Sequence, residues 1–332
     1  MATVPTSRHH FPRHETTSAP SVAPPVLARS THIVGCEPLF SFQGRPGGIT
    51  VDQDETVYMS DSDSATIWRI SLEGTAEPLI ALAIGRDRLY SPAGMALALD
   101  GSLVVADATA HRVCSVGLDG SIRVLAGGAS GYREGPAAQA AFRFPRAVAV
   151  GSDGTVFVAD AGNDRIRQIS PDGQVATLAG SIYDYGDGTG SHARFRRPSG
   201  LAIDPSGVLY VADTGNNAIR RLAPDGRVNT VAGSPPGGHG DGAGRAAGLR
   251  WPAAVAVGDD GWLWVADYGN SAVRLIDRAG ATSTVFEIPG LGWPAAVAAL
   301  PGCRAVVAGS ALDDRHDRSG CLMVIGDGRL KL

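Results

Sequence analysis

The stretch that decides the fold runs Pro145-Arg-Ala-Val-Ala-Val150, Gly154-Thr-Val-Phe-Val-Ala-Asp160, Ala161-Gly-Asn-Asp-Arg-Ile166, Pro171-Asp-Gly173 and Val175-Ala-Thr-Leu-Ala-Gly180. The same pattern begins again at Pro198, and weaker copies begin at Pro46, Pro92, Pro252 and Pro294. Repetition at this scale is the sequence mark of a repeat architecture, in which each copy is one supersecondary unit. The chain therefore contains six such units.

Each unit predicts four short antiparallel strands. Apolar residues alternate, or run for about five positions, between Gly, Asp and Pro residues, which is typical of such strands. Ser152-Asp-Gly154 and Pro171-Asp-Gly173 separate the first and last strand pairs, and Asp-Gly favours hairpin turns because glycine adopts positive φ at little cost. Sheets with two apolar faces must stack on like sheets. The predicted fold is all-β, a six-bladed β-propeller of four-stranded antiparallel blades.

The N-terminal part of the propeller is predicted to close the ring. Thr31-His-Ile-Val-Gly35 matches the outer-strand pattern of Asn229-Thr-Val-Ala-Gly233 and precedes the first inner strand. We therefore expect it to complete blade six as an outer strand. Cys36 and Cys321 would then lie on the same face, and their pairing stays open because a reducing cytosol disfavours disulfides.

Composition divides the chain into two parts. Residues 1–28 are rich in Pro, Ser and Thr and are predicted to form a disordered tail, whereas residues 29–332 form the propeller. The tail has no apolar run long enough for a secretory signal, and no stretch approaches the roughly 20 apolar residues that span a bilayer. We expect a cytoplasmic, monomeric protein. A transit peptide is the alternative that Arg8, Arg13 and Arg29 leave open.

The charge balance disfavours nucleic acid as a partner. The formal net charge is −4 and the isoelectric point is near 6.1, so the chain has no overall basic field. Lys331 is the only lysine, and the other basic residues are arginines. RNA binding by an arginine-rich face remains an alternative, which would require affinity to fall steeply with salt.

One motif identifies a family resemblance. Val158-Ala-Asp-Ala-Gly-Asn163 followed by Arg165-Ile166, and Val211-Ala-Asp-Thr-Gly-Asn216 followed by Ile219, resemble the NHL repeat, and the resemblance covers about residues 31–330. Members of that family include RNA-binding regulators, extracellular sensor domains and adhesion proteins, and related propellers include lyases and lactonases. The resemblance thus implies a fold and no particular reaction. Blade six departs from the pattern at Ala308-Gly-Ser310 and in the loop 313–317, so we expect it to be irregular.

Two sets of acidic residues recur from blade to blade. A residue needed once for chemistry need not appear in five blades, so we assign structural roles to the strand-end aspartates by hydrogen bonding to backbone N–H groups of the turn that follows. These are Asp61, Asp107, Asp160, Asp213 and Asp267. The loops between blades carry Glu134, Asp187 and Asp241, each followed by an apolar plug at Phe142, Phe195 or Leu249. Calcium held by Asp184 and Asp187 is an alternative role.

The columns before each proline vary and are the stronger candidates for binding. The loops that connect blades lead toward the central channel, so these columns are expected around its mouth. Three adjacent blades place Arg143, Arg196 and Arg250 two positions before proline. Guanidinium groups beside aromatic rings suit an anionic or aromatic ligand. The predicted ligand-binding set is Arg143, Arg146, Arg196, Arg197, Arg250, Trp251 and Tyr268. The competing interpretation pairs the arginines with Glu134, Asp187 and Asp241.

Histidines provide the alternative enzyme hypothesis. His111, His192, His239 and His316 all fall in loops predicted on one face, and lyases related to the NHL family use such histidines for zinc. Three histidines with an open fourth position could activate water. Their spacing matches no local metal motif. The sequence predicts no cofactor, with zinc or calcium as the alternative.

The sequence therefore favours recognition over catalysis. We predict a propeller that binds a partner protein or a small anionic or aromatic ligand at the channel mouth. The alternative is a propeller lyase, hydrolase or isomerase that acts at the same mouth with metal assistance. No Gly-x-Ser-x-Gly elbow or phosphate-binding loop is present in the sequence, which removes the commonest hydrolase and nucleotidase mechanisms.

Overall fold

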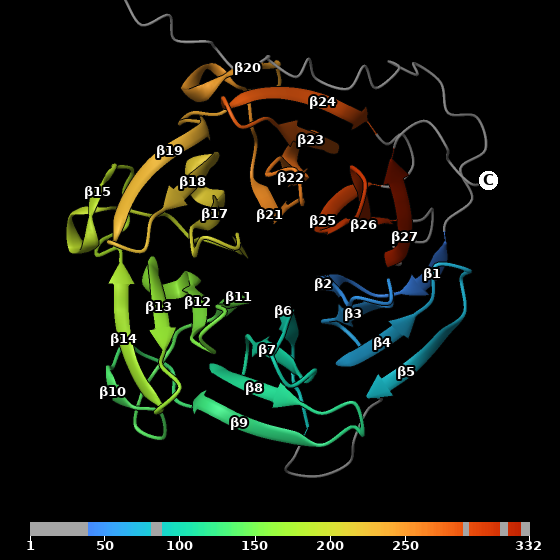
Figure 1. Ribbon diagram of the computed structural model, residues 1–332, viewed down its shortest axis with the longest axis vertical. Coiled ribbons are helices and arrows are strands. Elements are labelled where there is room, and N and C mark those ends of the chain that lie inside the picture. The colour runs from blue at the N-terminus through green and yellow to red at the C-terminus, as the bar shows by residue number, and fades with distance from the viewer. Residues whose placement is uncertain (1–38, 81–87, 288–291, 313–317, 327–332) are drawn as a thin grey trace, which may run out of the picture.

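The structure is a computed structural model that describes residues 39–80, 88–287, 292–312 and 318–326. Six antiparallel sheets surround a central axis in chain order (Figure 1). This arrangement confirms the six-bladed β-propeller. The predicted tail boundary at residue 28, Cys36 and His316 lie outside the described residues.

We name the four main strands of each blade A to D, from the axis outward. The inner strands, called A, each follow a connection between blades. They are β2 (Pro46–Val51), β6 (Pro92–Leu97), β11 (Pro145–Val150), β16 (Gly200–Ile203), β21 (Pro252–Val257) and β25 (Trp293–Leu300). The second strands, called B, are β3 (Val57–Asp61), β7 (Leu103–Asp107), β12 (Val156–Asp160), β17 (Leu209–Asp213), β22 (Leu263–Asp267) and β26 (Arg304–Leu312).

The outer half of each blade is a second hairpin. The third strands, called C, are β4 (Thr66–Ile70), β8 (Arg112–Val116), β13 (Arg165–Ile169), β18 (Ala218–Leu222), β23 (Ala272–Ile276) and β27 (Arg318–Gly326). The outer strands, called D, are β5 (Ala76–Ile80), β9 (Ile122–Gly127), β14 (Gln174–Ala179), β19 (Arg227–Gly233), β24 (Ala281–Glu287) and β1 (Phe40–Gln43). The turn glycines Gly154 and Gly173 have φ of 83° and 79°, as Asp-Gly hairpins require.

Three blades are wider than predicted. The connections that follow β9, β14 and β19 each contribute a two-residue strand to the outer edge of the following blade. These strands are β10 (Gly135–Pro136), β15 (Gly188–Thr189) and β20 (Gly242–Ala243). Short 3-10 helices occupy connections as well, namely η1 (Ala161–Asn163), η2 (Gly190–His192), η3 (Thr214–Asn216), η4 (Gly244–Ala246) and η5 (Tyr268–Asn270). The four-stranded prediction therefore holds for blades one, two and six, and blades three to five have five strands.

An N-terminal strand closes the ring, as predicted, and the part of it that the structure describes is β1. β1 pairs with β27 in the register Phe40↔Leu322, so blade six joins the two ends of the propeller (Figure 1). Residues 31–35 lie outside the described residues. Phe42 is buried against Gly320 and the core between blades six and one, which gives this strand an apolar anchor. The pattern at Thr31–Gly35 does not include Phe42, so the sequence analysis did not identify this apolar anchor.

The two ends of the propeller differ in their connections. One end collects the D–A connections between blades and the B–C connections within blades, and we call it the loop face. The other end collects the A–B and C–D hairpin turns, and we call it the turn face. The apolar plugs predicted between blades are confirmed, because Phe142, Phe195 and Leu249 are fully buried in the clusters that join neighbouring sheets. All the predicted binding residues within blades three to five begin or precede inner strands or follow strand B, which places them on the loop face.

Candidate functional site

Arg143, Arg196 and Arg250 are held on the loop face by their backbones. Each donates its N–H to the strand-end aspartate of its own blade, Asp160, Asp213 or Asp267, at 2.7 Å. Each side chain then runs over the glycine of the following B–C connection. A Cβ at Gly162 would approach the Cγ of Arg143 to 2.6 Å, and Gly215 and Gly269 lie equally close to the other two. The Asp-x-Gly sequence thus positions the arginine stem.

The strand-end aspartates have the structural role that the repetition predicted, with a different main donor. The expected donors were backbone N–H groups of the B–C turn. The observed backbone donor in blades three to five comes from the D–A connection, and the other carboxylate oxygen accepts from an asparagine side chain, as Asp213 does from Asn216 at 2.8 Å. One carboxylate therefore fastens the approach to strand A onto the end of strand B.

The loop acids do not pair with the arginines that precede proline. Asp187 accepts hydrogen bonds from Arg220 and Arg245, and Asp241 accepts from Arg274. Glu134 accepts from the N–H of Thr177 and the hydroxyl of Tyr132. The interpretation that paired these acids with Arg143, Arg196 and Arg250 is therefore wrong. Among the described residues, those three guanidinium groups have no carboxylate partner.

Three residues directly before proline adopt a left-handed backbone. Phe144, Arg197 and Trp251 have φ of 48°, 51° and 48°, a conformation that is rare for bulky residues and costs of order 1–3 kcal/mol. The surrounding structure must compensate for this strain. It does so through a hydrogen bond that crosses to the preceding blade.

We call this hydrogen bond the blade latch. The N–H of Phe144 donates to Nδ1 of His111 at 3.1 Å, that of Arg197 donates to Oδ1 of Asp164 at 2.8 Å, and that of Trp251 donates to Oδ1 of Asn217 at 2.9 Å. The three acceptor residues end the B–C connections and are themselves left-handed, with φ near 54° to 55°. Each latch fixes a mouth residue of one blade to the turn of its neighbour, and it turns the Phe144, Arg197 and Trp251 side chains toward solvent.

Arginines from three blades converge at the axial end of the loop face. Arg146 is exposed, yet desolvation by surrounding protein lowers the pKa of its guanidinium, and the positive charges of Arg45 and Arg197 lower that pKa further. The Arg146 guanidinium is therefore partly enclosed by protein although the residue reaches solvent. Arg45 forms a long ion pair with Asp63 at 3.7 Å, whereas Arg146 and Arg197 form no hydrogen bond or ion pair through their side chains with any described residue. We call these three residues the arginine triad.

Aromatic rings lie on the same face as the triad. Tyr268 stacks on Trp293 with ring centroids 5.9 Å apart, and the guanidinium of Arg196 lies 4.4 Å from the ring centre of Tyr183. Trp251 is 49% exposed and lies under the guanidinium of Arg250. The cation–π contacts join the Tyr183 and Trp251 rings to arginines of the same face. The predicted cationic and aromatic residues therefore share one face.

The predicted histidines are not grouped in the part of the chain that the structure describes. His111 serves the blade latch, and its pKa is lowered by desolvation and by the charge of Arg143. His192 ends η2, and Nε2 of His239 lies 3.6 Å from Oε1 of Glu287. The described ranges contain no cluster of three or more His, Cys, Asp or Glu side chains that could hold a metal ion. Asp184 pairs with Arg194, while Asp187 pairs with two arginines, so calcium has no assembled site there.

Sequence reasoning missed the most deeply buried arginines. Arg167, Arg220 and Arg274 on strand C are fully buried, and each pairs with its strand-end aspartate at 2.7–3.0 Å. Their recurrence in one column was visible in the sequence, because each lies three residues after the left-handed residue Asp164, Asn217 or Ser271. Their burial was not, because arginine is rarely buried without a partner and the partner lies seven residues earlier.

Comparison with known proteins supports the fold. A family model described as NHL repeat matches residues 142–169 and 195–222. The chain is 33% identical over 176 residues to Protein SUPPRESSOR OF QUENCHING 1, chloroplastic, of Arabidopsis thaliana, which covers 48% of this chain and 16% of that protein. It is 24% identical over 292 residues to NHL repeat-containing protein 2 of Bos taurus, covering 73% of this chain and 40% of that protein.

A solved structure gives the same architecture. A putative gluconolactonase superposes with a TM-score of 0.60 at 18% identity, over 87% of this chain and 92% of that one. At this identity the likeness shows the fold alone. The protein is thus a six-bladed β-propeller. Within that class, the matched units and the Val-Ala-Asp-x-Gly-Asn motifs identify NHL repeats in blades three and four and support the NHL-repeat propeller family.

The chain spans less than half the length of these two curated relatives. Their activities and partners as whole proteins are therefore not carried over to it. No helix among the described residues is long and apolar enough to cross a membrane. The expected cytoplasmic location stays a prediction.

Proposed function

We propose that this propeller recognises an anionic group attached to an aromatic or apolar body, presented by a small ligand or a partner protein, at the axial end of the loop face. The observation that carries the proposal is the arginine triad. Desolvation lowers the pKa of Arg146, and the neighbouring positive charges of Arg45 and Arg197 lower that pKa further, so this site disfavours the free cation. An anion that binds between these arginines would reduce the repulsion between their positive charges.

The chemistry of the groups defines the ligand. Guanidinium groups present planar pairs of N–H donors that match carboxylate and phosphate oxygens. Rings such as Trp251 and the Tyr268–Trp293 stack offer flat apolar surface for the body that carries the anion. Together they favour an aromatic or apolar anion over a bare inorganic ion.

The blade latch supports binding by preorganisation. Arg197 and Trp251 are held in strained backbone conformations before any ligand arrives. Side chains that are already ordered lose less conformational entropy on binding, which increases affinity. Strain of this kind is concentrated at functional sites in proteins, and here it recurs in three adjacent blades.

Calorimetric titration with phenyl phosphate tests the proposal. We expect saturable binding that is weaker for inorganic phosphate, and a loss of roughly tenfold or more in affinity for Arg146→Gln or Arg197→Gln, since a charge-assisted hydrogen bond contributes about 1.5–3 kcal/mol. Arg194→Gln is the matched control, because Arg194 is an exposed arginine already paired with Asp184. Binding that is absent, or equally reduced in the control, would contradict the proposal.

A further inference from the structure

A second concave site lies on the turn face, between blades three and four. Its volume is about 610 Å³, within the range of about 300–1,000 Å³ typical of small-molecule sites. Phe157 on β12 and Leu178 on β14 line it from blade three, and Ile203, Leu209 and Leu222 line it from blade four. The cleft is separate from the arginine triad, because it is lined by hairpin turns of the turn face and the triad lies on the loop face.

The cleft exists because the side chains of one cross-strand pair fill less of the space between blades than the corresponding pair in blade five. Phe157 pairs with Gln168 across β12 and β13, and the corresponding pair in blade five is Trp264 with Leu275. Trp264 and Leu275 are each only 1% exposed and fill the space between blades five and six. Phe157 and Gln168 are half-buried, and the Gln168 amide has no hydrogen-bond partner among the described residues. The space beside this strand pair is therefore filled by side chains in blade five and left open in blade three.

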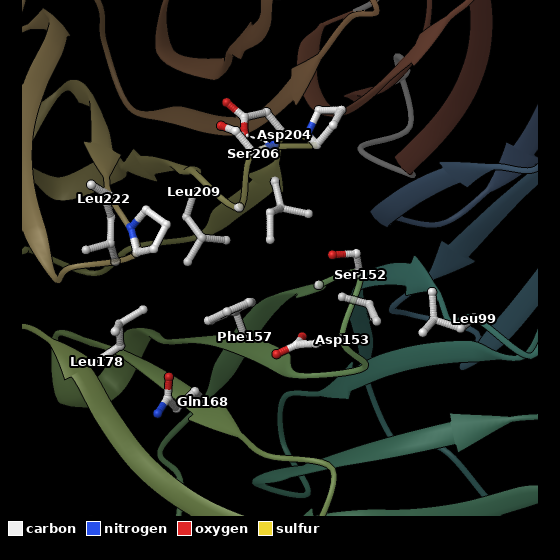
Figure 2. A pocket seen from close by; sticks show the side chains of 17 residues that line it. Leu99, Ser152, Asp153, Phe157, Gln168, Leu178, Asp204, Ser206, Leu209 and Leu222 are labelled. Atoms are coloured by element: carbon white, nitrogen blue, oxygen red, sulfur yellow. Dashed lines mark hydrogen bonds between the residues drawn. The ribbon is translucent and has the colours of Figure 1, made fainter.

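The two charged residues that line the cleft, Asp153 and Asp204, are both acidic. Figure 2 shows Asp153 on one side of the cleft, near Phe157, and Asp204 on the other side. Hydrogen bonds from the backbone and hydroxyl of Thr155 lower the pKa of Asp153, so this carboxylate is ionised at neutral pH. The residues that line the cleft include no Arg, Lys or His.

The acidic rim extends a pattern of the whole turn face. Almost every hairpin turn on this face carries an aspartate that accepts hydrogen bonds from its own turn or lies within it. Described examples are Asp52, Asp100, Asp119, Asp153, Asp172, Asp204, Asp225, Asp260 and Asp277. The loop face, by contrast, carries the arginine triad. A ligand for the cleft must therefore combine an apolar body with positive charge.

We propose that the cleft between blades three and four binds a small organic cation, with its apolar body against Phe157 and Leu178 and its ammonium group between Asp153 and Asp204. The apolar lining removes hydrocarbon from water, and the two carboxylates select the sign of the charge. This site is independent of the function proposed for the loop face.

Two probes of equal shape and opposite charge test the site. Fluorine NMR titrations would compare p-fluorophenylbutylammonium with p-fluorophenylbutanoate. We expect the ammonium to bind roughly five- to tenfold more tightly, the change that corresponds to one or two partly exposed ion pairs. The double variant Asp153→Asn with Asp204→Asn retains the oxygens that accept the backbone N–H groups of the turns and removes both charges, so it should abolish this preference.

A filling variant locates the binding. Phe157→Trp with Gln168→Leu installs the pair that blade five already uses, and it should abolish binding of the ammonium probe. If that variant does not fold, Leu178→Phe fills the cleft from the neighbouring strand and replaces it. Arg146→Gln, on the loop face, should bind the ammonium as the unchanged protein does. Absence of binding at millimolar probe, equal binding of both probes, or unchanged binding in the filled variant would overturn the proposal.

Discussion

Two sets of arginines in this propeller show how environment decides the role of one residue type. Arg167, Arg220 and Arg274 are fully buried, and each joins its strand-end aspartate to carbonyl oxygens of the preceding D–A connection. Arg143, Arg196 and Arg250 are exposed and lack carboxylate partners among the described residues. The two sets alternate along the same three blades. The first holds each blade together, and the second leaves charge free on the surface.

The difference teaches where to seek function in a repeat protein. A buried charge requires a partner, so it recurs wherever the partner recurs, as Asp213 and Arg220 do in homologous positions of three blades. An exposed charge without a partner has no such requirement. Arg146 occupies a column in which other blades have Gly, Ala or Ser, and its neighbourhood raises its energy. Irregularity within the repeat therefore marks the candidate site better than repetition does.

The largest expected effect comes from breaking the buried set. Arg220→Met retains an aliphatic stem but leaves Asp213 buried without its countercharge, and we expect it to lower the free energy of unfolding by about 3–5 kcal/mol. Arg196→Met in the same blade is the matched control, with an expected loss below about 1 kcal/mol because only a cation–π contact with Tyr183 is removed. Urea denaturation measures both. Equal losses would show that the distinction between the two sets is false.

A smaller effect should come from pH, acting on one latch alone. The folded state favours neutral His111, since desolvation lowers its pKa below 6.5, so the unfolded chain binds this proton first. Its stabilising contribution is therefore complete above about pH 6.5 and declines as pH falls toward the lower folded pKa. Protonation at Nδ1 would also remove the acceptor for the Phe144 N–H, a bond with a net contribution of about 0.5–1.5 kcal/mol.

The variant His111→Asn isolates this contribution. Asparagine is the residue that serves the equivalent latch at Asn217, so the acceptor is retained and the titration removed. We expect the stability of the variant to fall less than that of the unchanged protein between about pH 7 and pH 5. Urea midpoints measured across that range give the comparison. Parallel pH profiles would mean that His111 does not act as a titratable latch.

Much of the fold could be predicted from the sequence because the same strand and turn pattern recurs in six units. The hairpins at Gly154 and Gly173 and the plugs at Phe142 and Phe195 depend on local turn chemistry and on period-two burial, which sequence patterns carry directly. The described closing strand, β1, was not identified from the sequence, because its pairing depends on long-range packing. In the structure Phe42 provides that packing against Gly320.

The candidate site was predicted in composition and not in geometry. The columns before proline identified Arg197 and Trp251, yet nothing local indicated their left-handed backbones, which require an acceptor from another blade. The contribution of Arg45 was also missed, because blade one meets blades three and four only across the axis. The cleft beside Phe157 depends on the volumes of two paired strands, which a single column of the repeat does not reveal.

The most direct test of the division between structural and binding arginines is thermal unfolding with and without saturating phenyl phosphate, for the unchanged protein, Arg146→Met and Arg220→Met. A ligand at about 100 times its Kd stabilises the folded state by about 2.7 kcal/mol. We predict that Arg146→Met leaves the unliganded midpoint equal or higher and loses about half or more of the ligand-induced increase, whereas Arg220→Met lowers the midpoint and retains that increase. A lowered midpoint with a full ligand response in Arg146→Met would contradict the account.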